Sequence, residues 1–339
     1  MDAVVAAAHS KFCWNAAAAA FSLSIVAVAA LTIYRLSGQI DVAAAVTALR
    51  SQSLRQVLIA LGFIACAYLS LSLYDVVALW TIGRKAIPYR TAALASFTSY
   101  TIGHNLGATI LMAGIIRYRL YSAWGLRVGE IGAIAFITSL TYWLGNAFVL
   151  GGGLLYAPEA VGALDRLPVA ANRLVGAAML VALACYFAWI LRGPHRVSRA
   201  GWRIVVPGPR AILLQVVIAT LDLVFAAAAM YVLLPPQPPI DFPHLLTITV
   251  AAMLIGVVSH APGSLGVMEA AIFLGLPQFN KEALLASLVT FRIVYFVLPL
   301  LIAGPVLGLR ESILLGTRFG LVRSFRPMRT NMPNRSELR

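Results

Sequence analysis

The stretch Val257-Val258-Ser259-His260-Ala261-Pro262-Gly263-Ser264-Leu265-Gly266-Val267-Met268-Glu269 decides the fold that the sequence predicts. An apolar helix ends there at a Pro-Gly pair, and a second helix restarts with an acidic residue in its first turns. In lipid, the backbone N–H and C=O groups freed by such a break must be satisfied by protein or by a watery cavity. Because broken helices line the binding sites of secondary transporters, we expect a functional site at this break.

The composition predicts a polytopic membrane protein. Of the 339 residues, 61% are hydrophobic and 11% are charged, whereas a soluble domain carries about 25% charged residues. The net charge of +14 lies largely in short loops, as expected for membrane orientation and contact with anionic headgroups. These loops lack a recognition fold and interleaved aromatics, so we expect no nucleic-acid partner. The three scattered cysteines predict neither a disulfide framework nor a metal site, and no cofactor is expected.

Eight apolar stretches follow one another, each near or above the ~20 residues that a spanning helix needs: 16–34, 56–80, 91–116, 130–155, 172–191, 211–234, 243–275 and 283–309. If all eight crossed the membrane, Lys and Arg would divide evenly between its two sides. If 91–116 and 243–275 are instead re-entrant hairpins, 19 of the 26 Lys and Arg residues are cytoplasmic and 6 lie outside. The sequence therefore predicts an all-α membrane protein with six spanning helices and two re-entrant broken-helix hairpins.

The same topology predicts an inverted repeat, because the order span, span, hairpin, span occurs twice and starts from opposite faces. Both termini are then cytoplasmic, and an interfacial amphipathic helix is expected over 42–57. The second span of each half carries a single aspartate, Asp75 or Asp222. The predicted units are a first half at 1–155, a second half at 156–310 and a basic cytoplasmic tail at 311–339.

Four charged residues near the first hairpin and in the second spans are candidate binding residues. A carboxylate at membrane depth costs about 2.5–3.5 kcal/mol, so Asp75 and Asp222 should face a cavity or a cation. For Asp75, an interfacial ion pair with Arg84 is the structural alternative. Arg117 and Arg119 close the hairpin and could grip a phosphate bidentately, or could anchor the helix at the interface.

The second hairpin and the last span supply further candidates. Glu269 follows the Pro262 break, and Arg292 lies deep in the last span, so the two could form a purely structural salt bridge. His104 and His260 each lie at a hairpin break, where a histidine more often bonds a freed backbone group than a metal. The candidate set for lipid binding is completed by the break residues Asn105, Pro262, Gly263 and Gly266.

No motif in the chain predicts catalysis. The sequence contains no H-E-x-x-H, no G-x-S-x-G and no Walker loop. The spacing of Gly103 and Gly107, and of Gly304 and Gly308, suits close helix packing and permits a homodimer without requiring one. We therefore expect a membrane protein without catalytic residues.

Five motifs, in order, resemble the membrane domain of the multiple peptide resistance factor (lysylphosphatidylglycerol synthase/flippase) family over roughly residues 35–310. They are Tyr74-Asp75, Ala95-Ser96-Phe97 through His104-Asn105-Leu106-Gly107, Gly114-Ile115-Ile116-Arg117-Tyr118-Arg119-Leu120-Tyr121-Ser122, Ser259 through Glu269, and Arg292-Ile293-Val294-Tyr295 with Leu298-Pro299-Leu300. The resemblance implies a bacterial inner-membrane lipid flippase that moves aminoacylated phosphatidylglycerol to the outer leaflet. In the family, this transport protects against cationic antimicrobial peptides.

The resemblance also implies what to expect of partners and mechanism. The family's cytosolic synthase domain has no counterpart in this sequence, so we expect no lysyltransferase activity and a separate synthase as a partner. In the expected mechanism, the lipid phosphate is held by Arg117, by Arg292 and by the helix start after Pro262. The headgroup amines are received by Asp75, Asp222 and Glu269.

Three alternatives stay open at this point. One is a transporter of another polar or polyprenyl-linked lipid, and another is a membrane scaffold for a separate lipid synthase. The third is an intramembrane enzyme that uses His104, His260 and Glu269. Identification of the bound lipid, turnover of a labelled lipid, and tolerance to loss of the buried charges would separate them.

Overall fold

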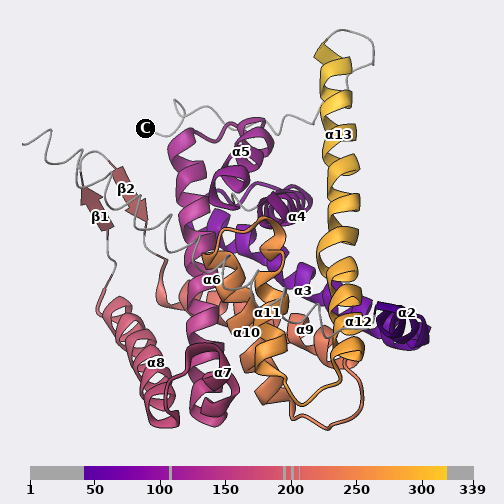
Figure 1. The fold of residues 1–339 in the computed structure, drawn as a ribbon. Helices are drawn as coiled ribbons and strands as arrows, with labels where there is room; N and C mark the ends of the chain where they lie inside the picture. Colours follow the sequence, from indigo (N-terminus) through magenta and orange to yellow (C-terminus); the bar gives the residue numbers. More distant parts are fainter. Residues whose placement is uncertain (1–41, 107–108, 194–195, 200–201, 206, 319–339) are drawn as a thin grey trace, which may run out of the picture.

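A computed structural model describes residues 42–106, 109–193, 196–199, 202–205 and 207–318 (Figure 1). Its helices are α2 Val42–Ser51, α3 Leu54–Thr81, α4 Tyr89–Leu106, α5 Thr109–Ser122, α6 Val128–Tyr156, α7 Gly162–Asp165, α8 Val169–Leu191, α9 Pro209–Leu233, α10 Phe242–Val258, α11 Val267–Gly275, α12 Lys281–Arg292 and α13 Leu298–Arg318. Two 3₁₀ turns, η1 Pro158–Val161 and η2 Pro262–Ser264, and one π-helical segment, η3 Ile293–Val297, complete the helical structure of these residues.

Five helices of the described part are long and apolar enough to cross a membrane. They are α3, α6, α8, α9 and the continuous run from α12 into α13. This confirms the all-α polytopic membrane fold, and the five helices coincide with five of the six predicted spans. The remaining predicted span, 16–34, and the end of the tail from 319 lie outside the described residues. A short antiparallel pair, β1 Arg196–Arg199 and β2 Trp202–Val205, was not predicted.

The first predicted hairpin is present as α4 and α5, which pack against each other. The hydroxyl of Ser99 on α4 donates to the carbonyl oxygen of Ala113 on α5 at 3.4 Å. Arg84 precedes this pair of helices and Glu130 follows it, yet their side chains form an ion pair at 2.7 Å. The chain therefore leaves the pair of helices at the end where it arrived, as a re-entrant segment must.

The second predicted hairpin is α10 and α11, and the helix breaks where the sequence predicts. Between them the backbone has positive φ at His260, Gly263 and Gly266, with values of 55°, 58° and 78°. The left-handed conformation is easiest for glycine, and it turns the chain back on itself. Phe279 after α11 belongs to a large apolar cluster, and Ile240 before α10 packs against the same cluster.

The tips of the two hairpins meet inside the bundle. Turn η2 at the tip of the second hairpin contacts α4 of the first. A Cβ atom added at Gly263 would lie 3.8 Å from the carbonyl oxygen of Asn105, near the end of α4. Gly263, at the break of the second hairpin, is thus buried against the end of α4 rather than exposed to lipid.

Helices α3 and α9, which carry Asp75 and Asp222, form the most extensive helix–helix contact of the described part. They are the second spans of the two predicted halves, and the element order span, hairpin, span recurs after each of them. The symmetry relation between the halves stays a prediction. α8 lies at the edge of the bundle, where it packs mainly against α6 (Figure 1).

We predict that the close approach of α6 and α9 depends on Gly145. A Cβ atom there would overlap the Cβ of Ala219, whereas nothing lies within 4 Å of a Cβ atom added at Gly152 on the same helix. Gly145→Ala should lower the free energy of unfolding by about 1–3 kcal/mol, the usual cost of overpacking. Thermal unfolding in detergent checks this against the control Gly152→Ala, and an equal effect of the two changes would contradict it.

The re-entrant hairpin predicts which sites react with a membrane-impermeant thiol reagent. In a variant with all native cysteines replaced by serine, Lys85→Cys before α4 and Trp124→Cys after α5 should be labelled from the same side of the membrane. Gln237→Cys, between α9 and α10, should be labelled from the opposite side. Labelling of Lys85→Cys and Trp124→Cys from different sides would show that α4 and α5 together cross the membrane.

Candidate functional site

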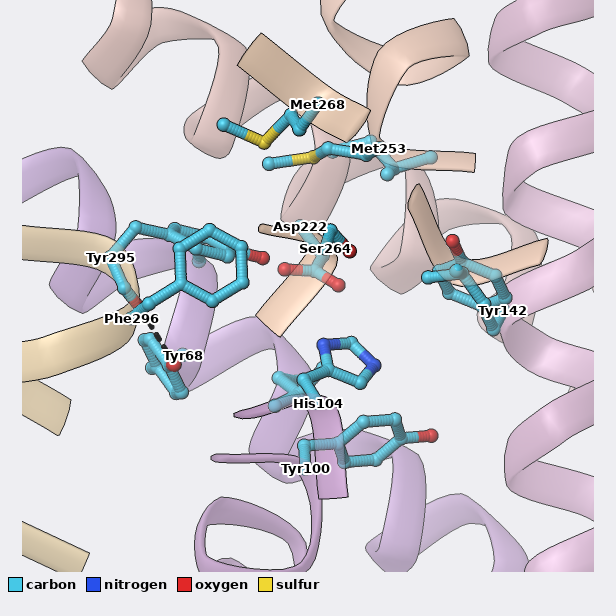
Figure 2. Close-up of a pocket in the computed structure, with 14 residues that line it drawn as sticks. Tyr68, Tyr100, His104, Tyr142, Asp222, Met253, Ser264, Met268, Tyr295 and Phe296 are labelled. Atoms are coloured by element: carbon cyan, nitrogen blue, oxygen red, sulfur yellow. Dashed lines mark hydrogen bonds between the residues drawn. The ribbon is translucent and has the colours of Figure 1, made fainter. Parts of the chain in front are cut away.

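A cavity of about 40 Å³ lies between α3, α4, α6, α9, the second hairpin and the π segment (Figure 2). Its polar and aromatic lining comprises Tyr68, Tyr100, His104, Tyr142, Asp222, Ser264, Tyr295 and Phe296. Each water molecule needs roughly 10–15 Å³ of space that is open to its centre. The space therefore suits a few waters or one ammonium group, and a whole lipid headgroup requires the cavity to widen.

Asp222 is the charged residue of this lining. It lies on α9, is 6% exposed, and accepts a hydrogen bond at 3.1 Å from the hydroxyl of Tyr74 on α3. Within the described part of the chain, no Lys or Arg forms an ion pair with it. A buried carboxylate without a cationic neighbour is costly unless it takes up a proton or a cation. Figure 2 shows Asp222 near the centre of the site, between His104 and the two methionines Met253 and Met268.

Aromatic rings form much of the remaining wall. The Tyr100 ring packs edge-on against Tyr74 and against His104, with centroids 5.7 Å apart in both pairs. The Tyr68 and Tyr295 rings are 5.9 Å apart across the cavity lining. Aromatic faces attract cations, and tyrosine hydroxyls add hydrogen-bonding atoms. Together with one carboxylate, this lining is chemically suited to an amine.

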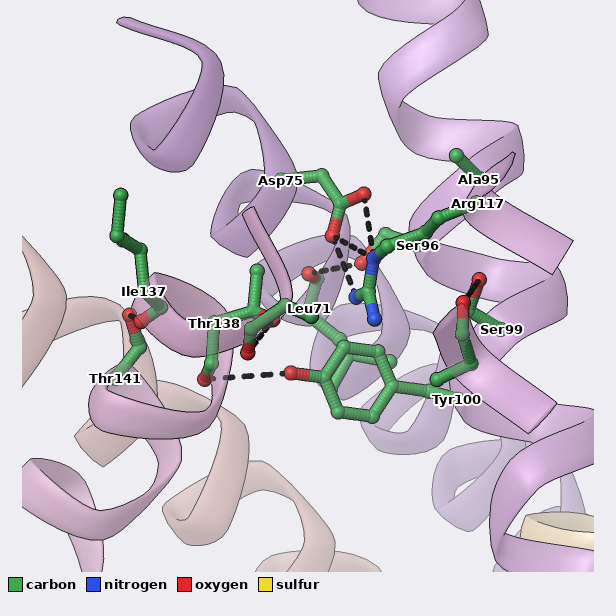
Figure 3. Close-up of polar contacts among 12 residues, drawn as sticks. Leu71, Asp75, Ala95, Ser96, Ser99, Tyr100, Arg117, Ile137, Thr138 and Thr141 are labelled. Carbon is green, nitrogen blue, oxygen red and sulfur yellow. Dashed lines mark hydrogen bonds and ion pairs between the residues drawn. The ribbon is translucent and has the colours of Figure 1, made fainter. Parts of the chain in front are cut away.

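Asp75 and Arg117 form a separate ion pair that is sealed from solvent (Figure 3). The Arg117 guanidinium donates to both carboxylate oxygens, with Nη2–Oδ1 at 2.7 Å and Nε–Oδ2 at 3.0 Å, and the Tyr121 hydroxyl donates to Oδ2 at 2.7 Å. The two charged side chains are 0% and 3% exposed. They satisfy each other, so neither faces the cavity in this conformation. The alternative pairing of Asp75 with Arg84 is wrong, because Arg84 pairs with Glu130.

Tyr100 lies between the sealed pair and the cavity. The Arg117 guanidinium carbon is 5.2 Å from the centre of the Tyr100 ring, and Tyr100 also lines the cavity. Tyr74 and Asp75 are neighbours on α3, where successive side chains point about 100° apart. Tyr74 therefore reaches Asp222 while Asp75 reaches Arg117, so the two polar groups lie in different directions from α3.

The predicted pair of Glu269 and Arg292 forms, and it holds the second hairpin to the last span. The Arg292 guanidinium donates through two nitrogens to the Glu269 carboxylate, and its Nη1 donates to the carbonyl oxygen of Gly263 at 2.9 Å. The other Glu269 oxygen accepts from the backbone N–H of Gly266 at 2.8 Å. Glu269, Gly266, Gly263 and Arg292 thus stabilise the turn that begins at Pro262, without lining the cavity.

The π segment begins directly after Arg292 and supplies two cavity residues, Tyr295 and Phe296. Its wider turn frees carbonyl groups, and two of these accept side-chain hydrogen bonds. The Tyr68 hydroxyl donates to the Tyr295 carbonyl at 3.0 Å, and the Asn105 amide donates to the Phe296 carbonyl at 3.4 Å. π segments occur often at functional sites, and this one joins α3, the first hairpin and the cavity wall.

The structure therefore brings together only part of the predicted set at the cavity. Asp222 and His104 line it, and Asn105 supports its wall. Arg119 and His260 are exposed. The His260 ring Nδ1 lies 2.8 Å from the carbonyl oxygen of Val258, which confirms its predicted contact with a freed backbone group.

The cavity tyrosines were missed from the sequence. Tyr68, Tyr100, Tyr142 and Tyr295 all lie well inside apolar stretches, away from the ends where aromatic belts occur. Since a buried tyrosine hydroxyl usually finds a polar partner, this depth is the signal that could have identified them.

Two proteins are similar to this chain over most of its length. The chain is 29% identical over 251 residues to the inner membrane protein YbhN of Escherichia coli, which covers 72% of this chain and 76% of that protein. It is 28% identical over 249 residues to the uncharacterized protein slr0712 of Synechocystis sp., with the same two shares covered. No family model matches the chain. The likeness to an inner membrane protein agrees with the multi-pass membrane fold.

We predict that breaking the sealed pair on one side is far more costly than breaking the exposed pair of Arg84 and Glu130. Arg117→Met leaves the Asp75 carboxylate buried and unpaired, which should lower the free energy of unfolding by about 3–5 kcal/mol. The double variant Asp75→Leu/Arg117→Met should recover most of this loss. Arg84→Met should cost less than about 1 kcal/mol, because the Arg84 side chain is 42% exposed and its ion pair is screened.

Thermal unfolding of the four proteins, each in the same detergent, measures these differences. Equal losses for Arg117→Met and Arg84→Met would contradict the predicted difference between the two pairs.

Proposed function

We propose that this protein is a lipid transporter that moves phospholipids with an amine-bearing headgroup across the bacterial inner membrane. The substrate that we expect is aminoacylated phosphatidylglycerol, the cargo implied by the sequence resemblance. The observation that supports this most directly is Asp222, a buried carboxylate with no described ion-pair partner in a cavity walled by tyrosines. An ammonium group is the ligand that both features favour.

Phosphatidylglycerol without an aminoacyl group is expected to be a poor substrate. Its headgroup carries no positive charge, and the described cavity lining contains no Lys or Arg that would receive its phosphate. Arg117 and Arg292 are held by carboxylates, which argues against their direct contact with phosphate in this conformation. The amine thus provides the recognition, while the acyl chains stay in the bilayer.

Transport further requires the cavity to open, because about 40 Å³ does not hold a headgroup. The two hairpins and the π segment surround the cavity. Side-chain hydrogen bonds from Tyr68 and Asn105 join the π segment to α3 and to the first hairpin. Movement of these elements against the α3–α9 pair would widen the site, as in transporters built from two halves.

A reconstituted system tests the proposal. The purified protein is placed in liposomes that contain lysyl-phosphatidylglycerol with a fluorophore on one acyl chain, and dithionite is added outside. The wild-type protein should make nearly all of the fluorophore accessible, whereas vesicles without protein should lose only the outer-leaflet signal. Asp222→Asn should slow this by about tenfold or more, because it removes a charged hydrogen bond worth roughly 1.5–3 kcal/mol.

Glu159→Gln is the matched control, since it makes the same chemical change at a side chain that is 59% exposed. It should leave transport unchanged. Equal rates for labelled lysyl-phosphatidylglycerol and phosphatidylglycerol would instead favour a carrier of other polar lipids. Absence of transport of either lipid would overturn the proposal.

A further inference from the structure

We propose that the transporter exchanges a proton for the headgroup amine, with Asp222 as the group that holds one or the other. This inference rests on the proposed function and adds what drives it. When no lipid is bound, Asp222 carries a proton, and arrival of an ammonium group releases it. The balance is COOH + R–NH₃⁺ → COO⁻···⁺H₃N–R + H⁺: the O–H bond of the carboxyl group breaks, the proton passes to water, and the ion pair forms.

The inference follows from the burial and the surroundings of the carboxylate. Asp222 is 6% exposed within the bundle, where an ionised carboxylate without a counter-charge is strongly disfavoured. One positive charge at the Asp222 carboxylate makes the site neutral. A second positive charge would leave the buried site with a net charge again, which is as unfavourable as the unpaired carboxylate. Proton and ammonium therefore exclude each other at this site.

The groups that face Asp222 leave it as the site of exchange. Packed elements present tyrosines from α3, α4, α6 and the π segment, and His104 from α4, while α10 and α11 present methionines. The other membrane-buried carboxylates, Asp75 and Glu269, are held by Arg117 and Arg292. Within the described lining, His104 is the one imidazole, and the tyrosine hydroxyls are the other titratable groups.

The direction of exchange gives the transport a source of energy. Bacterial inner membranes keep protons at higher electrochemical potential outside than inside. A carrier that returns a proton inward for each amine carried outward would use this difference to enrich the outer leaflet. Without a gradient, the same carrier would only equilibrate the lipid between leaflets.

The experiment measures lysyl-phosphatidylglycerol in the two leaflets of proteoliposomes with an impermeant amine reagent. With the outside more acidic than the lumen, wild-type protein should raise the outer-leaflet fraction above the value at equal pH, and the reversed gradient should lower it. Asp222→Asn should abolish this response, while Glu159→Gln, at an exposed side chain away from the cavity, should keep it. Transport by the wild-type protein that ignores the gradient would overturn the exchange but leave the proposed function standing. Absence of transport at every pH would instead count against the proposed function itself.

Two further measurements guard against a variant that fails to fold. In the wild-type protein alone, the proton competes with the headgroup amine. The apparent affinity for lysyl-phosphatidylglycerol should therefore fall by about tenfold for each unit by which the pH is lowered, in the range where Asp222 is protonated. Infrared spectra of the lipid-free protein should show a protonated carboxyl band that is absent in Asp222→Asn. A binding affinity independent of pH, or a gradient response that is lost in His104→Gln but kept in Asp222→Asn, would overturn the assignment.

Discussion

Polar groups inside a membrane must find partners within the protein, and the structure depends on this constraint. Two hairpins end in broken backbone, and their tips meet inside the bundle, where η2 packs against α4. Arg292 donates to the Gly263 carbonyl of one tip, while Asn105 at the other tip donates to the Phe296 carbonyl. The last span therefore satisfies a carbonyl of the second break, and the first hairpin satisfies a carbonyl of the π segment, as hydrocarbon surroundings require.

The buried charges obey the same constraint with one exception. Asp75 pairs with Arg117, and Glu269 pairs with Arg292, so both arginines are held within the described bundle. Asp222 has only the Tyr74 hydroxyl among the described contacts, and it faces a small aromatic cavity. This exception identifies the candidate site, because a positive charge that balances Asp222 would have to come from a proton or from a bound ligand. In our proposals, a proton and the amine of a lipid headgroup occupy the site in turn.

Much of the fold could be predicted from the sequence, because apolar length and the distribution of arginine are strong signals. The five spans that the structure describes, the Pro262 break and both hairpins followed from them, and the Arg84–Glu130 ion pair places the two ends of the first hairpin together. The site could be predicted only in part. Charged residues in apolar runs were easy to find, but their pairing was not, since Arg117 and Asp75 are 42 residues apart and meet only in the folded bundle. The π segment at 293–297 and the tyrosine wall also depend on tertiary packing, which a single sequence does not reveal.

The central claim is that the amine of a lipid headgroup binds at Asp222. A structure of the protein in nanodiscs that contain lysyl-phosphatidylglycerol tests it most directly. The account predicts a widened cavity, with density for the headgroup amine within ion-pair distance of the Asp222 carboxylate and against the rings of Tyr68 or Tyr100. A headgroup bound elsewhere, or an Asp222 carboxylate that pairs with an arginine of the protein when lipid is present, would contradict it.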